Sequence, residues 1–201
     1  MIAHTRPAVV MLLLFTVLTG LIYPLAVTGL AQLALPKQAN GSMIERDGMV
    51  LGSALIGQAF AADKYFHGRP SATSAPDPKD DTKTIDAPYN AANSTGSNLG
   101  PISKKLLERV KGDADALKAE SGLATVPADS VTTSASGLDP HISAGFAKAQ
   151  AARIAKVRGL TEDRVRGLIA EMTEHASVGL VGEERVNVLL LNLALDRLSS
   201  T

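Results

Sequence analysis

The feature that most constrains this chain is the stretch of residues 7–36, which contains no charged side chain. A helix needs about 20 mostly apolar residues to cross the hydrocarbon core of a bilayer. We therefore predict a transmembrane anchor at residues 9–35, after a short N-terminus of residues 1–8. The alternative is a signal peptide cleaved near Val27-Thr28-Gly29, but the apolar run is about twice the usual length of a signal core.

The predicted anchor contains residues suited to packing against other helices. Pro24 has no backbone N–H, so it leaves a carbonyl of the preceding turn free and favours a bend. Gly20 and Gly29 have small surfaces, which let a second helix approach closely. The residues expected to contribute to anchoring and helix packing are Val9, Leu14, Leu18, Gly20, Tyr23, Pro24 and Gly29.

The charges that flank the anchor give only a weak signal of its orientation. Arg6 and the terminal amine precede it, and Lys37 and Arg46 follow it, so the positive-inside rule finds nearly equal counts. A short N-terminus ahead of a first hydrophobic helix most often stays in the cytoplasm. We therefore expect a single-pass protein whose residues 36–201 form an extracytoplasmic soluble domain.

Composition excludes several classes of function. Lys plus Arg and Asp plus Glu each number 20, and aromatic residues make up 3% of the chain with no Trp. A chain with neither a basic field nor aromatic platforms is not expected to bind nucleic acid. The absence of cysteine excludes disulfides and thiolate chemistry, and a domain of roughly 150 residues can fold without such links.

Beyond the anchor, the pattern predicts an α+β fold with a small β-sheet or hairpin packed by helices. Residues 42–60 are expected to form a hairpin around Asp47-Gly48, with a well covered second strand because both of its faces are apolar or small. Residues 72–98 are rich in Pro, Asp, Asn, Ser and Thr, which predicts a long loop. Helical spacing then predicts helices over residues 101–121, 140–160, 162–172 and 186–198, with Ile102 on the apolar face of the first and Thr161 as the N-cap of the third.

Residues 134–143 hold the side-chain types of a hydrolase triad, in Ser134, Ser136, Asp139 and His141. Residues so close in sequence rarely fold into a triad, and the Gly-x-Ser-x-Gly pattern is absent. The local chemistry is better explained by a helix start, with Asp139 as N-cap and Pro140 at the first helical position. A membrane-tethered hydrolase that uses Ser136 and His141 is the third and weakest hypothesis.

No metal or phosphate motif stands out in the sequence. The four histidines are scattered, and Asp77, Asp80 and Asp81 lack calcium-loop spacing. The stretch "GSALIGQ" lacks the Lys-Ser/Thr of a phosphate-binding loop. We therefore expect no metal site and no catalytic residue.

Several stretches nevertheless form a specific ordered set behind the hydrophobic helix: "GSALIGQAF", "YFHGRPS", "YNAANSTGSNLGP", "VTTSASGLDPHIS", "RIAKVRGL" and "VNVLLLNLALD". Over essentially its whole length the chain resembles the C subunit of the Kdp-type potassium-transporting ATPase. It departs from that pattern in a longer loop between Ser71 and Tyr89, in Ala91, where some members have proline, and in Thr95, where a glycine is common. These departures lie in or beside one loop.

The resemblance implies an accessory, non-catalytic subunit of a potassium transport complex in the cell inner membrane. Its partners would be a channel-like potassium-binding subunit and a P-type ATPase subunit, which the chain would assemble and stabilise. The candidate subunit contacts, taken from the matching stretches, are Tyr65, Phe66, Gly68, Arg69, Ser97, Asn98, Leu99, Ser136, Gly137, Leu138 and Asp139.

The resemblance also implies an alternative role as a catalytic chaperone that raises the ATP affinity of the ATPase subunit. On that account Gln150 is one possible nucleotide contact. The residues themselves favour a glutamine on the surface of an amphipathic helix, because Gln150 lies within the helical pattern of residues 140–160. No tightly bound cofactor is expected, and ATP would be reached only through the partner ATPase subunit.

Overall fold

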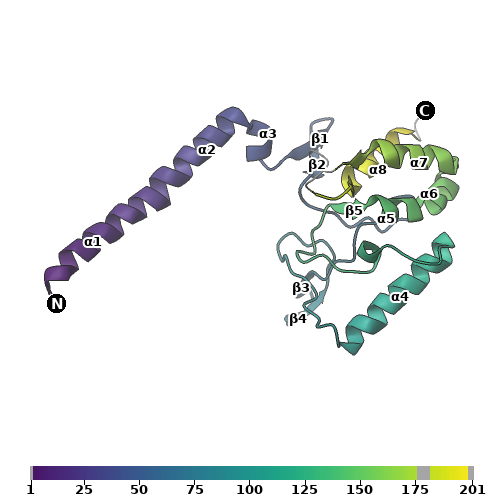
Figure 1. The fold of residues 1–201 in the computed structure, drawn as a ribbon, viewed down its shortest axis with the longest axis horizontal. Coiled ribbons are helices and arrows are strands. Elements are labelled where there is room, and N and C mark those ends of the chain that lie inside the picture. The colour runs from purple at the N-terminus through teal and green to yellow at the C-terminus, as the bar shows by residue number, and fades with distance from the viewer. Residues whose placement is uncertain (1, 176–181, 199–201) are drawn as a thin grey trace. The chain divides into compact units, whose positions relative to one another are not determined.

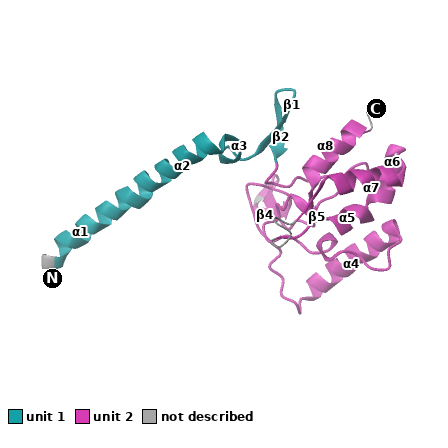
Figure 2. Cartoon of the chain, turned by 45° about the horizontal axis from the view of Figure 1, so that its top comes forward, with its two compact units in different colours: residues 1–53 teal, residues 54–201 magenta. Residues whose placement is uncertain are grey.

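The computed structural model describes residues 2–175 and 182–198. In chain order the α-helices are α1 (Ile2–Val17), α2 (Tyr23–Ala34), α3 (Pro36–Ala39), α4 (Lys104–Ser121), α5 (Ala144–Ala149), α6 (Ala151–Arg158), α7 (Glu162–Glu171) and α8 (Val188–Leu198). The strands are β1 (Met43–Arg46), β2 (Met49–Ser53), β3 (Ser74–Asp77), β4 (Asp80–Asp86), β5 (His141–Ser143), β6 (Thr173–Glu174) and β7 (Arg185–Asn187). These elements divide into two compact units, residues 1–53 and residues 54–201 (Figure 1 and Figure 2).

The first unit is dominated by one long apolar helix. Residues His4–Ala34 are long and apolar enough to cross a membrane, and none of the most apolar stretch is buried. A π-helical turn, Leu18–Ile22, joins α1 to α2 just ahead of Pro24. In this turn the Tyr23 N–H donates to the Leu18 carbonyl. Local widening to a π turn is a known cause of helix bending, and this turn lies just ahead of Pro24, where the sequence predicts a bend.

The first unit also contains the predicted hairpin, with β1 and β2 antiparallel. Asp47 and Gly48 both have positive φ, at 53° and 75°, which the tight turn between twisted strands requires. The expectation that the second strand is covered was wrong, because Met49 and Val50 are 66% and 55% exposed. The strand is therefore exposed at its start, while Leu51, Gly52 and Ser53 are half-buried.

In the second unit, helices α5 to α8 pack with a small antiparallel sheet of order β5-β7-β6. This arrangement confirms the α+β fold class. The core is formed by Phe66, Ile142, Phe146, Ala147, Ala151, Ile154, Ala155, Val165, Leu168, Ile169, Val186, Val188, Leu191 and Leu195. Short β7 leads directly into α8, so the "VNVLLL" stretch contributes to both the sheet and the helix.

The predicted long loop at residues 72–98 contains a second hairpin, which corrects the sequence prediction. Strands β3 and β4 pair antiparallel, with Ser74 opposite Asp86 and Ala75 opposite Ile85. The turn is closed by the Asp77 carboxylate, which accepts from the Lys79 N–H at 2.8 Å. The turn-forming residues of this stretch therefore mark one tight reversal, and the β-branched residues of β4 form the return strand.

Two predicted helix starts also shift. Helix α4 begins at Lys104, because the Ser103 side chain caps it, and Ile102 lies outside it at 97% exposure. Asp139 is not an N-cap. Its carboxylate accepts from the His141 N–H, β5 follows, and Ser143 caps α5 by accepting from the Phe146 N–H at 3.0 Å. The cap at Thr161 is confirmed by its bond from the Arg164 N–H.

Candidate functional site

Four of the six sequence stretches that carry the resemblance contribute residues to one site in the second unit, which we call the glycine–tyrosine junction. It consists of Gly57, Gly68, Arg69, Tyr89 and Asp139. Gly57 donates its N–H to the Leu138 carbonyl at 2.8 Å, which links the first of these stretches to the fourth. The last two stretches, from α6 and α8, hold the segment that leads into Gly68, as described below.

Tyr89 is the centre of the junction. Its hydroxyl donates to the Arg69 carbonyl at 2.8 Å. Its ring lies against Gly57 and Gly68, and a Cβ built on either glycine would collide with it. Burial, and then the charge of Asp139, raise the pKa of Tyr89 to about 12. The phenol is therefore a neutral hydrogen-bond donor over the ordinary pH range.

Arg69 and Asp139 form an ion pair across the junction, with Nη1 and Oδ2 2.9 Å apart. The other Arg69 nitrogen, Nη2, lies 3.3 Å and 3.4 Å from the hydroxyl and carbonyl of Thr132. The second Asp139 oxygen accepts from the His141 N–H at 3.0 Å. Both side chains are about three-quarters buried, so the pair fixes the 132–141 segment against the 65–71 segment.

Gly137 closes the other side of the same region. It has φ of 68°, and a Cβ there would fall 2.5 Å from Thr73 Cγ2 and 2.7 Å from the Thr95 carbonyl oxygen. The Ser71 hydroxyl donates to the Gly137 carbonyl at 2.8 Å. A glycine is therefore required by both backbone conformation and space.

Two buried carboxamides hold the segment that precedes the junction. The Phe66 N–H donates to Asn192 Oδ1 at 2.8 Å, and Asn192 Nδ2 donates to the Phe66 carbonyl at 3.0 Å. The His67 N–H donates to Gln150 Oε1 at 2.8 Å, and Gln150 Nε2 donates to the His67 carbonyl at 3.2 Å. We call these four residues the double amide clamp, in which each side chain satisfies both backbone groups of one residue.

Arginines from α6 extend this support toward the N-terminal side. Arg153 Nη1 donates to the carbonyls of Asp63 and Tyr65, and Arg153 Nη2 donates to Gln150 Oε1 at 2.7 Å. Arg158 stacks on the Tyr65 ring, 5.0 Å from its centroid, and pairs with Asp196 of α8 at 2.8 Å. Residues 63–67 are thus held by side chains from two helices.

A cavity of about 290 Å³ lies beside the clamp and is lined in part by His67, Asp113, Glu120 and Gln150. Burial, and then the charge of Arg153, lower the pKa of His67. Burial, and then Arg185, lower the pKa of His141, which belongs to a different cavity. Among residues 2–175 and 182–198, no group of three His, Asp or Glu side chains could hold a metal ion.

The hydrolase hypothesis finds no geometric support. The Ser136 hydroxyl accepts from the Leu138 N–H at 3.1 Å, and within the described parts of the chain no hydrogen bond joins it to His141. His141 Nδ1 lies 3.8 Å from Asp139, whose other oxygen is bound to Arg69. These residues form a turn and an ion pair in place of a nucleophile–base pair.

The predicted site residues fall into separate groups. Gly68, Arg69, Leu138 and Asp139 come together at the junction, with Gly137 beside it. The other predicted contacts are placed as follows: Ser97 bonds to Thr133, Tyr65 bonds to Asp196, Asn98 has φ of 50°, Leu99 lines a separate cavity of about 440 Å³, and Ser136 bonds to Leu138.

Two predictions need correction. Phe66 is fully buried in the core, so in this structure its ring has no surface to offer a partner. Gln150 is 2% exposed and lies at the break between α5 and α6, which makes it a core residue and not the helix-surface glutamine that the periodicity indicated.

Gly57, Tyr89 and Asn192 were missed by sequence reasoning. The available signals were a glycine in a strand-like stretch and an asparagine, Asn192, within a strongly apolar helix. A buried amide in such a helix requires a polar partner. The sequence does not show where that partner is.

The fold and the site together define a class of protein: an α+β domain that follows, in sequence, a helix able to span a membrane, and whose polar side chains hold its own backbone. The family described as "K+-transporting ATPase, c chain", KdpC, matches residues 5–197. A potassium-transporting ATPase KdpC subunit of Rhodopseudomonas palustris (strain BisB18) is 63% identical over 98% of both chains. KdpC subunits of Bradyrhizobium diazoefficiens and Methylobacterium nodulans are 62% and 59% identical over 98% and 99% of both chains. The chain belongs to the KdpC family.

Proposed function

We propose that this chain is a non-catalytic accessory subunit that assembles and stabilises a channel-like potassium-binding subunit and a P-type ATPase subunit. The observation that supports this most directly is the helix at His4–Ala34, which buries none of its most apolar stretch. Gly20 and Gly29 have no atom within 4 Å of a built Cβ, so both leave room for another helix.

The side chains of the second unit support the same proposal. Arg69, Asp139 and Gln150 are polar side chains of the kind that can take part in catalysis. Each of them instead forms hydrogen bonds within its own chain. Such a domain acts by presenting a fixed surface to its partners. The chain would therefore influence potassium import through contacts, while the ATPase partner carries out the hydrolysis.

Deletion of this chain tests the proposal. We expect loss of growth at micromolar potassium and separation of the two larger subunits during purification. A narrower test replaces Gly20 or Gly29 with Leu, which should reduce co-purification because the small surface is lost. Leu25→Met, which keeps the volume of an exposed apolar side chain, is the matched control. An intact, active complex without this chain would reject the proposal.

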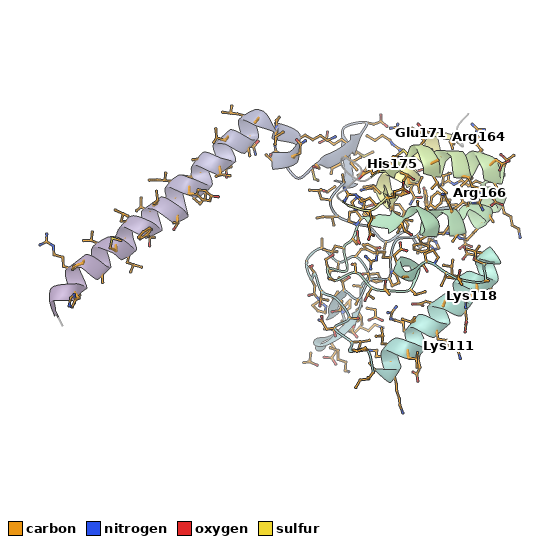
Figure 3. The ribbon with its side chains drawn as sticks, viewed as in Figure 1. Lys111, Lys118, Arg164, Arg166, Glu171 and His175 are labelled. Carbon is orange, nitrogen blue, oxygen red and sulfur yellow. The ribbon has the colours of Figure 1, made fainter. Side chains whose placement is uncertain are left out.

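We further propose that the N-terminus is cytoplasmic and that the second unit is extracytoplasmic in the inner membrane. The chain has no cysteine, so a single introduced cysteine gives an unambiguous signal. Lys118 on α4 is exposed (Figure 3) and is a suitable position. Labelling of Lys118→Cys by an impermeant thiol reagent in intact cells is expected. Labelling only after lysis would contradict this orientation.

Raising the ATP affinity of the ATPase subunit is the alternative role. Gln150 is the suggested nucleotide contact, but its side chain is occupied by His67 and Arg153. Asp113 and Glu120 line the adjacent cavity and would repel a triphosphate. We therefore propose that any effect on ATP affinity passes through contacts between subunits.

A further inference from the structure

The double amide clamp is an unusual way to hold an extended segment. Phe66 and His67 are adjacent residues, and each has its N–H and carbonyl bound by one carboxamide from a different part of the chain. Gln150 is 2% exposed and Asn192 is 1% exposed. Each side chain therefore does for its residue what a neighbouring strand does in a sheet.

The position of the clamp gives it a consequence for the junction. His67 is followed directly by Gly68 and Arg69, which contact Tyr89 and Asp139. The path from the clamp to the Arg69–Asp139 pair is thus two residues long. Release of the His67 peptide would free Gly68 to move away from Tyr89 and would loosen the Arg69 ion pair.

We infer that Gln150 and Asn192 are positioning residues for potassium transport, which set the Gly68-Arg69 surface through the backbone of Phe66 and His67. This inference rests on the proposed function as an accessory subunit. It assigns the same role to both carboxamides, although only Gln150 borders the cavity lined by His67. It also predicts that loss of Gln150 weakens the subunit's attachment to its partners without removing a nucleotide ligand.

The first experiment measures the clamp itself, by amide hydrogen exchange of the full chain in detergent. Gln150→Ala should make the His67 N–H exchange about 10- to 100-fold faster, and Asn192→Ala should do the same at Phe66, because a buried donor loses its acceptor. Gln150→Glu keeps the acceptor oxygen, so its effect on His67 should be smaller. Lys148→Ala, at an exposed site on α5, is the matched control and should leave both amides protected.

The second experiment uses the purified complex. Gln150→Ala and Asn192→Ala should both reduce retention of this subunit, and both should raise the potassium concentration for half-maximal ATPase activity, with the KM for ATP unchanged. Where an alanine variant yields no folded chain, Gln150→Glu and Asn192→Asp are compared in its place. These variants keep the acceptor oxygens for the N–H groups of His67 and Phe66, but they replace the Nε2 and Nδ2 donors by carboxylate oxygens that face the two carbonyls.

Two results would overturn the inference. One is unchanged exchange at His67 in Gln150→Ala. The other is a KM for ATP that rises in the Gln150 variants while the Asn192 variants behave as wild type, which would indicate direct nucleotide binding. The exchange measurement needs no partner subunit, so the clamp can be judged even if the proposed accessory function fails in the deletion test.

Discussion

The ring of Tyr89 occupies the space in which Gly57 lacks a side chain. A Cβ built on Gly57 would fall 2.5 Å from Tyr89 Cε1 and 2.6 Å from the Asp139 carbonyl oxygen. Residues 57, 89 and 139 are far apart in sequence, so this contact ties three segments of the second unit together. One of the two colliding atoms belongs to the backbone, which cannot turn aside as a flexible side chain would.

Gly57→Ala should therefore lower the free energy of unfolding by about 1–3 kcal/mol, the range for overpacking a well-filled site. The measurement is chemical denaturation of the full chain in detergent. Gly112→Ala is the control, because no atom lies within 4 Å of its built Cβ in the middle of α4. That change should raise stability by about 0.5–1 kcal/mol through helix propensity. Equal effects of the two substitutions would contradict the described packing.

The Arg69–Asp139 pair should be worth more than an exposed ion pair. Asp139→Asn leaves the Arg69 guanidinium about three-quarters buried without its anion, and Arg69 Nε already has no partner in the described structure. We expect a loss of about 1–3 kcal/mol in the free energy of unfolding. Glu162→Gln breaks the Glu162–Arg166 pair on α7, where both side chains are nearly half exposed, and should change stability by less than about 0.5 kcal/mol. A loss at Asp139 no larger than that at Glu162 would show that the junction is open to solvent.

Acid should destabilise the second unit through its histidines. Burial, and then Arg153, lower the pKa of His67 in the folded state. The unfolded chain consequently binds more protons, and stability falls as pH drops below the ordinary histidine pKa of about 6.5. Between pH 7.5 and 5, His67→Gln should reduce the slope of unfolding free energy against pH. Adding His141→Gln should reduce it further, because the pKa of His141 is also lowered, mainly by burial. An unchanged slope in the double variant would refute this assignment.

Ser143 should matter more than Ser136 for stability. Ser143 caps α5, and both its N–H and its hydroxyl donate to the Asp129 carboxylate, at 2.7 Å and 2.9 Å. Ser143→Ala is expected to cost about 1–2 kcal/mol, measured by thermal unfolding. Ser136→Ala, in an exposed turn, should stay within about 0.5 kcal/mol of wild type. The reverse order would contradict the cap that Ser143 provides to α5.

Local chemistry explains which parts of the fold were predictable. The turn at Asp47-Gly48, the cap at Thr161 and the apolar helix depend on residues within a few positions of one another, and all three are confirmed. The hairpin of β3 and β4 was missed because its turn formers and its strand residues were interpreted together as one irregular stretch.

The site was less predictable, because its contacts join residues that are distant in sequence. Gln150 fits a helical period, but the helix is interrupted at this residue, between α5 and α6. Its side chain bonds to the backbone of His67 and does not face solvent. Likewise, Asp139 and Pro140 form a good helix start by composition, yet Arg69 binds that carboxylate and β5 pairs with β7. In both cases a tertiary partner outweighed a local preference.

The double amide clamp has a consequence for tolerance of the surroundings. Gln150 and Asn192 carry no charge and do not titrate, so dissolved ions barely weaken their hold on Phe66 and His67. Ion pairs on the surface lose strength as ionic strength rises, because counterions screen them over about 8–10 Å. Phe66 and His67, which lead into the junction, are therefore held by neutral hydrogen bonds, whose strength depends little on ionic strength.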